Sequence, residues 1–187
     1  GAQQLAAFQH VDDDEPVDLT PAPGRALDET SFAVTPDGST VITSWNVADE
    51  PGYPRPQLVA IDTAAGERRV LADDPDVFFE QPAISPDGRQ VVCVRMRDTT
   101  YDDPPAYSLW LLDLSTGSTA DGRELVADPD LWPGEPQFSA DGSAIFFLAD
   151  QDGHRPVFRL DLATEQLTRV TESGHYANLL VCPDGAN

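Results

Sequence analysis

Hydrophobic residues in this chain fall in short runs or alternate with polar residues, and Gly or Pro interrupts them at frequent intervals. An amphipathic helix would instead repeat its apolar positions roughly every three or four residues over a longer stretch. Short apolar runs bounded by turn residues are typical of β-strands joined by tight connections. The pattern therefore predicts an all-β chain.

One pattern of strand, turn and strand occurs three times and begins a fourth time. Asp accepts hydrogen bonds from nearby backbone N–H groups and Gly adopts positive φ without steric cost, so each Asp-Gly pair is expected at a hairpin tip. The acidic ligands are too few and too widely spaced for a calcium loop. The copies are SFAVTPDGSTVITSW (31–45), PAISPDGRQVVCVRM (82–96), PQFSADGSAIFFLAD (136–150) and the incomplete NLLVCPDGAN (178–187).

A second hairpin follows each complete copy, always in the same order. Its three occurrences are QLVAIDTAAGERRVLA (57–72), SLWLLDLSTGSTADGRELVA (108–127) and PVFRLDLATEQLTRVT (156–171). The turn aspartates Asp37, Asp87, Asp141 and Asp184 recur at intervals of 50, 54 and 43 residues. Such intervals are close to the roughly 40 to 50 residues of one β-propeller blade.

Four antiparallel strands per repeat predict a partial β-propeller, because a β-sandwich has no need of the same hairpin pair in the same order three times. The fragment does not close a ring, so we expect exposed blade edges, pairing with a second copy into a homodimer, or a fragment of a larger propeller. The predicted blades cover residues 1–28 (partial), 29–78, 79–132, 133–175 and 176–187 (partial).

Charge narrows the choice of partners. The chain carries 33 acidic residues against 11 Lys and Arg, which gives a formal net charge of -22. A field of this sign repels phosphate backbones and anionic lipid surfaces. We therefore expect neither nucleic acid nor membrane as a partner.

Two cysteines, Cys93 and Cys182, lie far apart in different phases of the repeat. They offer neither a redox pair nor a four-ligand metal set, and both are expected as small buried hydrophobes. We expect no metal and no cofactor. The start of the chain lacks the charged and apolar regions of a signal peptide, so the expected location is cytoplasmic.

The repeat resembles the propeller of prolyl-oligopeptidase-type serine peptidases, in the branch of the acylaminoacyl-peptidases and dipeptidyl-aminopeptidases. The SPDG-type turns are shared with TolB-like propellers, whereas EPVDLTP (15–21) and the long segment before SLWLLDL (108–114) favour the peptidase propeller. The strings that carry the resemblance are LDETSFAVTPDGSTVITSW, LVAIDTAAGERRVLAD, QPAISPDGRQVVCVRM, SLWLLDLSTG and PVFRLDLATEQLTRVT, which together extend over nearly the whole chain.

This resemblance implies an α/β-hydrolase domain in the same parent chain and peptides as substrates. Such a domain carries its nucleophilic serine in a G-x-S-x-G motif, and the 187 residues contain no such motif. The three histidines, His10, His154 and His175, lie in unrelated turns and connections and form no catalytic set. No catalytic residue is therefore assigned, and this chain alone is not expected to hydrolyse peptides.

Binding residues are expected on the face that carries the longer connections, 46–56, 73–81, 97–107 and 128–135, because long loops with aromatic residues on a rigid scaffold commonly bind ligands. Glu80 and Glu135 are candidates for the free amine of a peptide, and His175 for a contact at the channel mouth. The alternative for the acids and for His175 is a solvated loop position, and for Phe78 and Trp132 it is packing between blades. The aromatic candidates are Phe78, Phe79, Trp132, Tyr53, Tyr101 and Tyr107.

Three functions remain open at this stage. The first is the non-catalytic propeller of a serine peptidase, which restricts and guides peptide access to its hydrolase domain. The second is a TolB-like propeller that binds a protein partner through one face. The third is a half-propeller that dimerises into one ring.

Overall fold

The computed structural model describes residues 3–7, 15–48, 54–116, 122–128 and 130–182. Within these ranges the chain forms β-strands and no helix. The strands form three four-stranded antiparallel sheets and one two-stranded sheet. The all-β prediction is thereby confirmed. The two-stranded sheet consists of β1 (Ala6–Ala7) and β2 (Val17–Asp18).

Each large sheet is a meander in which the strands follow one another in chain order. The first sheet comprises β3 (Phe32–Val34), β4 (Thr40–Ala48), β5 (Pro54–Asp62) and β6 (Arg68–Ala72). The second comprises β7 (Val77–Ile84), β8 (Gln90–Arg97), β9 (Ala106–Asp113) and β10 (Arg123–Leu125). The third comprises β11 (Trp132–Phe138), β12 (Ala144–Asp150), β13 (Val157–Asp161) and β14 (Leu167–Arg169).

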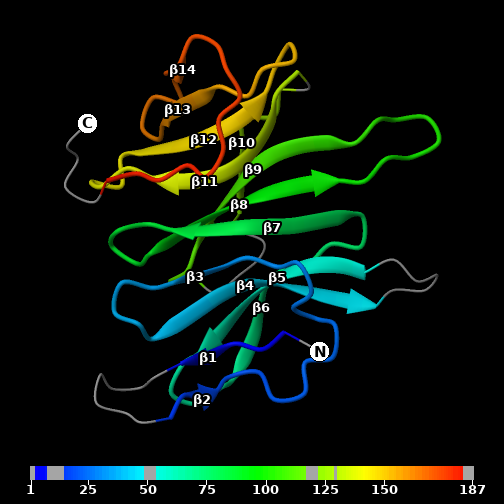
Figure 1. Ribbon diagram of the computed structural model, residues 1–187, viewed down its shortest axis with the longest axis vertical. Helices are drawn as coiled ribbons and strands as arrows, with labels where there is room; N and C mark the ends of the chain where they lie inside the picture. Colours follow the sequence, from blue (N-terminus) through cyan, green and yellow to red (C-terminus); the bar gives the residue numbers. More distant parts are fainter. Residues whose placement is uncertain (1–2, 8–14, 49–53, 117–121, 129, 183–187) are drawn as a thin grey trace.

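The three large sheets succeed one another along the long axis of the molecule (Figure 1). The first strand of the second and of the third large sheet packs against the sheet before it, since β7 contacts β3, β4 and β5, and β11 contacts β7, β8 and β9. Blades of a propeller pack in this way. The predicted partial propeller is confirmed, and the sheets are called the first, second and third blades below.

The core consists of apolar layers between the blades. Alternate residues of β8 point to opposite neighbours: Val91 and Cys93 belong to the layer shared with the first blade, and Val92 and Val94 to the layer shared with the third. A strand buried on both faces reads as a continuous apolar run, as VVCV does. Burial of this kind contributes about 1.5–3 kcal/mol per large side chain.

The two cysteines have different surroundings. Cys93 is fully buried, as predicted, and burial raises the pKa of its thiol. Cys182 is exposed, so its predicted burial is wrong. The reason is that residues 170–182 form no β-strand, so no sheet covers the Cys182 side chain.

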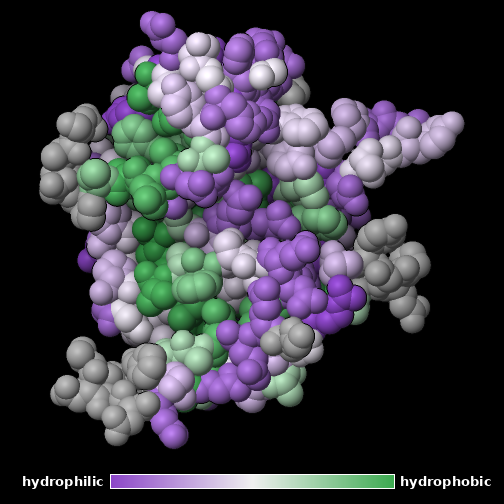
Figure 2. Space-filling view, in the orientation of Figure 1, coloured by the Kyte–Doolittle hydropathy of each residue, from purple (hydrophilic) through white to green (hydrophobic). Residues whose placement is uncertain are grey.

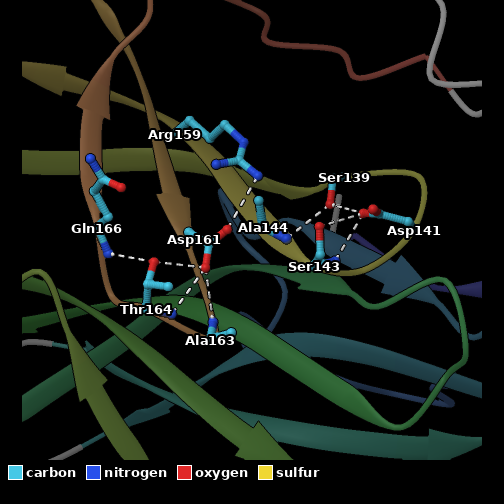
Figure 3. Close-up of polar contacts among 9 residues, drawn as sticks. All are labelled: Ser139, Asp141, Ser143, Ala144, Arg159, Asp161, Ala163, Thr164 and Gln166. Atoms are coloured by element: carbon cyan, nitrogen blue, oxygen red, sulfur yellow. Dashed lines mark hydrogen bonds and ion pairs between the residues drawn. The ribbon is translucent and has the colours of Figure 1, made fainter.

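Side-chain hydrogen bonds fix the Asp-Gly turns, and Figure 3 shows them in the third blade. The Ser139 hydroxyl donates to Asp141 Oδ1 at 2.7 Å, and the Ser143 backbone N–H donates to the same oxygen at 3.0 Å. The Ala144 N–H donates to Ser139 Oγ at 2.9 Å, while Gly142 takes a φ of 72°. Hydrogen bonds from Ser139 and Ser143 hold the pKa of Asp141 at about 2.

The other two blades repeat this turn. Thr35 and Ser85 donate to Asp37 and Asp87 at 2.7 and 2.6 Å. Hydrogen bonds from Thr35 and then Ser39 lower the pKa of Asp37 to about 2, and those from Ser85 and then Arg89 lower the pKa of Asp87. The hairpin-tip interpretation therefore holds for the three complete copies, whereas Asp184 lies outside the described residues.

Candidate functional site

One end of the blades, opposite the Asp-Gly turns, carries the longer connections. Strand pairing places them together, because Ala48 pairs with Pro54, Arg97 with both Val77 and Ala106, and Asp150 with Trp132. We call this end the long-connection face: the ends of β4, β8 and β12 with the starts of β5, β7, β9 and β11. The connection between β8 and β9 projects from it, well beyond the body of the molecule (Figure 1).

The surface differs across the molecule. Figure 2 shows apolar residues in a band along one side of the view, over β11, β7 and β3, where the Asp-Gly turns lie. The side from which the long connections project is largely hydrophilic in the same view. Binding through the long-connection face therefore depends on individual aromatic and charged residues more than on a broad apolar patch.

An aromatic stack links the second and third blades at this face. The rings of Tyr107 on β9 and Trp132 on β11 lie 4.9 Å apart with 24° between their planes. Trp132 is 44% exposed, so it both packs between blades and reaches solvent. Burial, followed by the charges of Glu80 and Asp98, raises the pKa of the Tyr107 hydroxyl.

Three consecutive candidates on β7 point to alternate sides. Phe79 is buried in the layer between the first and second blades, which favours packing over substrate contact. Phe78 and Glu80 are half-buried and line one cavity. Burial raises the pKa of Glu80, whose carboxylate makes no hydrogen bond or ion pair within the described residues.

The cavity lies between the first and second blades and has a volume of about 1050 Å³. Its walls are the second half of β4, the start of β5, the start of β7 and the segment 23–31 that precedes β3. Ser44 contributes a polar group to this wall: the residue is 2% exposed, and its Oγ has no hydrogen-bond partner in the described part of the chain. We call this space the interblade cavity.

Glu135 has a different environment, because both of its carboxylate oxygens are engaged. Oε1 accepts a hydrogen bond from Arg155 Nη1 at 3.0 Å, and Oε2 accepts one from the Leu179 backbone N–H at 3.0 Å. The Glu135 N–H donates to Gln81 Oε1 of the second blade at 2.7 Å. We call these contacts the Glu135 strut. They favour a structural role, and the predicted contact with substrate stays a prediction.

The remaining candidates lie apart from one another. Tyr101 is fully exposed in the projecting connection, where the Thr100 hydroxyl accepts hydrogen bonds from the backbone of Asp102 and Asp103. His175 is exposed and forms a backbone bridge with Arg155. Tyr53 lies outside the described residues.

The described ranges contain no cluster of His, Cys, Asp and Glu able to hold a metal ion. Over the same residues, no helix has the length and apolar character needed to cross a bilayer.

Sequence reasoning missed three residues of these sites: Ser44, Gln81 and Arg155. The repeat carried a signal for one of them. Ser44 occupies the position that Val94 and Leu148 hold in the other blades, whereas Gln81 occupies the position of Glu135, which is polar as well. A polar residue at an otherwise apolar position of a repeat indicates a local function or a local cavity.

Comparisons with solved structures find the same fold in several proteins. TolB from Acinetobacter baumannii matches with a TM-score of 0.66 and 22% identity, over 92% of this chain and 38% of that chain. A Mycobacterium tuberculosis puromycin-hydrolyzing peptidase matches with a TM-score of 0.63 and 21% identity, over 86% of this chain and 26% of that chain. The β-propeller domain of the Trilobed protease from Pyrococcus furiosus matches with a TM-score of 0.53 and 18% identity, over 73% of this chain and 40% of that chain.

The chain thus spans less than half the length of each of these structures. No family model matches the sequence, and no curated protein matches it significantly. The class of protein is nevertheless defined: this chain is part of a β-propeller. Its fold is found both in TolB and in the propellers of peptidases, so the resemblance noted in the sequence is confirmed at the level of the fold.

Proposed function

We propose that this chain is the non-catalytic propeller portion of a serine peptidase. In this role it restricts and guides the access of peptides to an α/β-hydrolase domain, which the 187 residues do not contain. The two free cysteines suit a reducing compartment, and we place the protein in the cytoplasm.

The observation that carries this proposal is the inequality of the two faces. Tight turns with internal hydrogen bonds close one face, as at Asp37, Asp87 and Asp141. The long-connection face instead presents the stacked Tyr107 and Trp132 together with the opening of the interblade cavity. Partly exposed aromatic residues on a rigid scaffold are suited to binding a second domain or a peptide.

Two steps test the proposal. The coding sequence that adjoins residue 187 is first read for a hydrolase domain with a G-x-S-x-G motif. The protein containing both parts is then assayed on a short fluorogenic peptide and on the same peptide inserted in a folded protein. We expect cleavage of the free peptide alone. Equal cleavage of both substrates, or a gene without a hydrolase domain, would contradict the proposal.

A TolB-like interaction propeller is the second candidate, favoured by the match to TolB over 92% of this chain. In that case the long-connection face binds a protein partner and no hydrolase domain is required. A half-propeller dimer is the third. Light scattering separates it from the others, since a strictly monomeric chain excludes a ring made from two copies.

A further inference from the structure

An aspartate that is followed by glycine can rearrange its own backbone, because glycine has no side chain to hinder the reaction. The glycine nitrogen attacks the aspartate Cγ, which closes a succinimide ring and releases water. Water then opens the ring, and opening at the backbone carbonyl leaves isoaspartate, whose main chain is one methylene longer. The sequence contains six Asp-Gly pairs, of which four lie wholly within the described residues.

Three of these four pairs form the hairpin tips of the blades, where both reacting groups are engaged. The N–H groups of Gly38, Gly88 and Gly142 donate to backbone carbonyls at 2.8, 2.9 and 2.9 Å. The preceding carboxylates accept hydrogen bonds from serine or threonine hydroxyls, which lower the pKa of each aspartate. Ring closure releases water from the protonated acid, so a lowered pKa slows the reaction further.

The fourth pair, Asp152-Gly153, lacks these restraints. It forms the turn between β12 and β13, in which Gln151 and His154 exchange two backbone hydrogen bonds of 2.9 Å. Over the described residues, the exposed Asp152 carboxylate makes no hydrogen bond or ion pair, and the Gly153 N–H donates to no acceptor. A Cβ placed on Gly153 would meet nothing within 4 Å, so the turn has room for the ring.

The backbone of this turn also differs from that of the hairpin tips. Asp152 has a φ of 51° and Gly153 a φ of 75°, the combination found in a type I′ turn. In each hairpin tip only the glycine has a positive φ. A residue with a Cβ is sterically strained in this region, and the added methylene of isoaspartate relaxes that strain.

We propose that Asp152 is a site of isoaspartate formation in the folded protein. The Gly153 nitrogen bonds to the Asp152 Cγ, and the carboxyl hydroxyl leaves as water with the amide proton. A second water adds to the Asp152 backbone carbonyl and breaks its bond to the Gly153 nitrogen. The product has the mass of the starting chain, and the reaction requires no oxidant or cofactor.

The modified residue carries a new free α-carboxylate. This group is the substrate of methyltransferases that esterify isoaspartate with the methyl group of S-adenosylmethionine. The turn adjoins the end of β12 on the long-connection face and lies three residues before Arg155, whose guanidinium pairs with Glu135. The added methylene therefore falls next to the Glu135 strut.

Incubation of the 187-residue chain in heavy-oxygen water at mildly acidic pH tests the inference, because each ring opening leaves a heavy oxygen at the reacting residue. Peptide mapping by mass spectrometry follows this label at the four described pairs. In the folded protein Asp152 should gain label about ten-fold faster, or more, than the three hairpin-tip aspartates, since a pKa of about 2 leaves little of the protonated acid. In urea-unfolded protein the four rates should be similar, because every one of these aspartates precedes glycine.

An isoaspartyl methyltransferase supplied with labelled S-adenosylmethionine identifies the product, and the methyl label should map to the peptide that contains Asp152. Asp152→Glu should abolish this label, because the ring from glutamate is larger and closes slowly. Ser139→Ala removes a donor to the Asp141 carboxylate and should accelerate reaction at Asp141 by about three- to ten-fold. The matched control Ser173→Ala changes an exposed serine outside these turns and should leave all four rates unchanged.

The inference is overturned if Asp152 gains label no faster than Asp141 in the folded protein, or if the rates differ equally in urea. It is also overturned if no methyl label maps to Asp152, or if a folded Ser139→Ala variant shows no acceleration at Asp141. Thermal unfolding confirms that each variant is folded, and the comparison of rates in the unmodified chain needs no variant. Neither result depends on the proposed access function.

Discussion

Replacing Glu135 with Ala removes the side-chain contacts of the Glu135 strut and should destabilise the third blade and its junction with the C-terminal segment that contains Leu179. The side chains of Arg155 and Glu135 are only 21% and 27% exposed, so solvent screens their ion pair less than it screens a surface pair. The loss comprises this pair and the hydrogen bond from the Leu179 N–H to Oε2. Hydrogen bonds to charged groups contribute about 1.5–3 kcal/mol each, and partial exposure reduces the expected total to about 2 kcal/mol.

Urea unfolding followed by tryptophan fluorescence measures this loss. The free energy of unfolding falls by about 2 kcal/mol per M urea, so the urea midpoint of unfolding should fall by about 1 M. Glu135→Gln keeps an oxygen for the Leu179 N–H while it removes the charge, and it should show a smaller decrease. The difference between the two variants separates the hydrogen bond from the ion pair.

The ion pair between Arg123 and Glu165 is the control, since it also joins an arginine to a glutamate but is more exposed. The side chains of this pair are 46% and 62% exposed, so Glu165→Gln should cost no more than about 0.5 kcal/mol. If Glu135→Ala is no more destabilising than Glu165→Gln, the side-chain contacts of Glu135 do not stabilise the fold. Its carboxylate would then be free for the substrate contact predicted from the sequence.

Three further predictions concern the turns and the exposed aromatic residue. Gly88→Ala should destabilise the fold by about 1 kcal/mol or more, and by more than Gly38→Ala. Both glycines have a φ of 72°, but only the new Cβ at Gly88 would meet a neighbouring atom, Pro36 Cδ at 3.3 Å. Equal changes in the urea midpoint would exclude this contact. Asp141→Asn should destabilise the fold at pH 7 and progressively less as the pH falls from about 4 to 2. The pKa of Asp141 is about 2 in the folded state and higher in the unfolded state, so its stabilisation is full above the unfolded pKa and is lost as the pH falls through the folded pKa. A loss of stability that does not change with pH would contradict this. Tyr101→Ala should change the free energy of unfolding by less than about 0.5 kcal/mol, because the ring is fully exposed. The same substitution should lower the affinity for a partner of the long-connection face. An unfolding midpoint well below that of the unmodified chain would show that the ring packs on the fold.

The sequence could predict the blades and their turns because the determinants are local. The hydroxyl at Ser139, the carboxylate at Asp141 and the glycine at Gly142 lie within four residues, and their hydrogen bonds close the hairpin without help from distant segments. The apolar run of β8 likewise indicates burial on both faces before any partner is known. The order of strands then follows from hairpin connections alone.

The site could be predicted only in part because its partners lie far apart in the sequence. Glu135 meets Arg155 and Leu179, which lie 20 and 44 residues further along the chain, in the connection between β12 and β13 and in the segment after β14. The sequence treated Glu80 and Glu135 as equivalent acids. The folded chain gives Glu135 two donors and leaves Glu80 beside a cavity, a difference that the sequence neighbours of the two residues do not encode.

The proposed access function requires the long-connection face to meet the hydrolase domain, and amide hydrogen exchange tests this contact most directly. Exchange of this chain is measured by mass spectrometry with and without the separately produced hydrolase domain. We predict slower exchange in residues 97–107 and 130–135, with the Asp-Gly turns at 36–39, 86–89 and 140–143 unchanged. Protection confined to those turns would contradict the claim, as would unchanged exchange at a domain concentration that restores peptide cleavage.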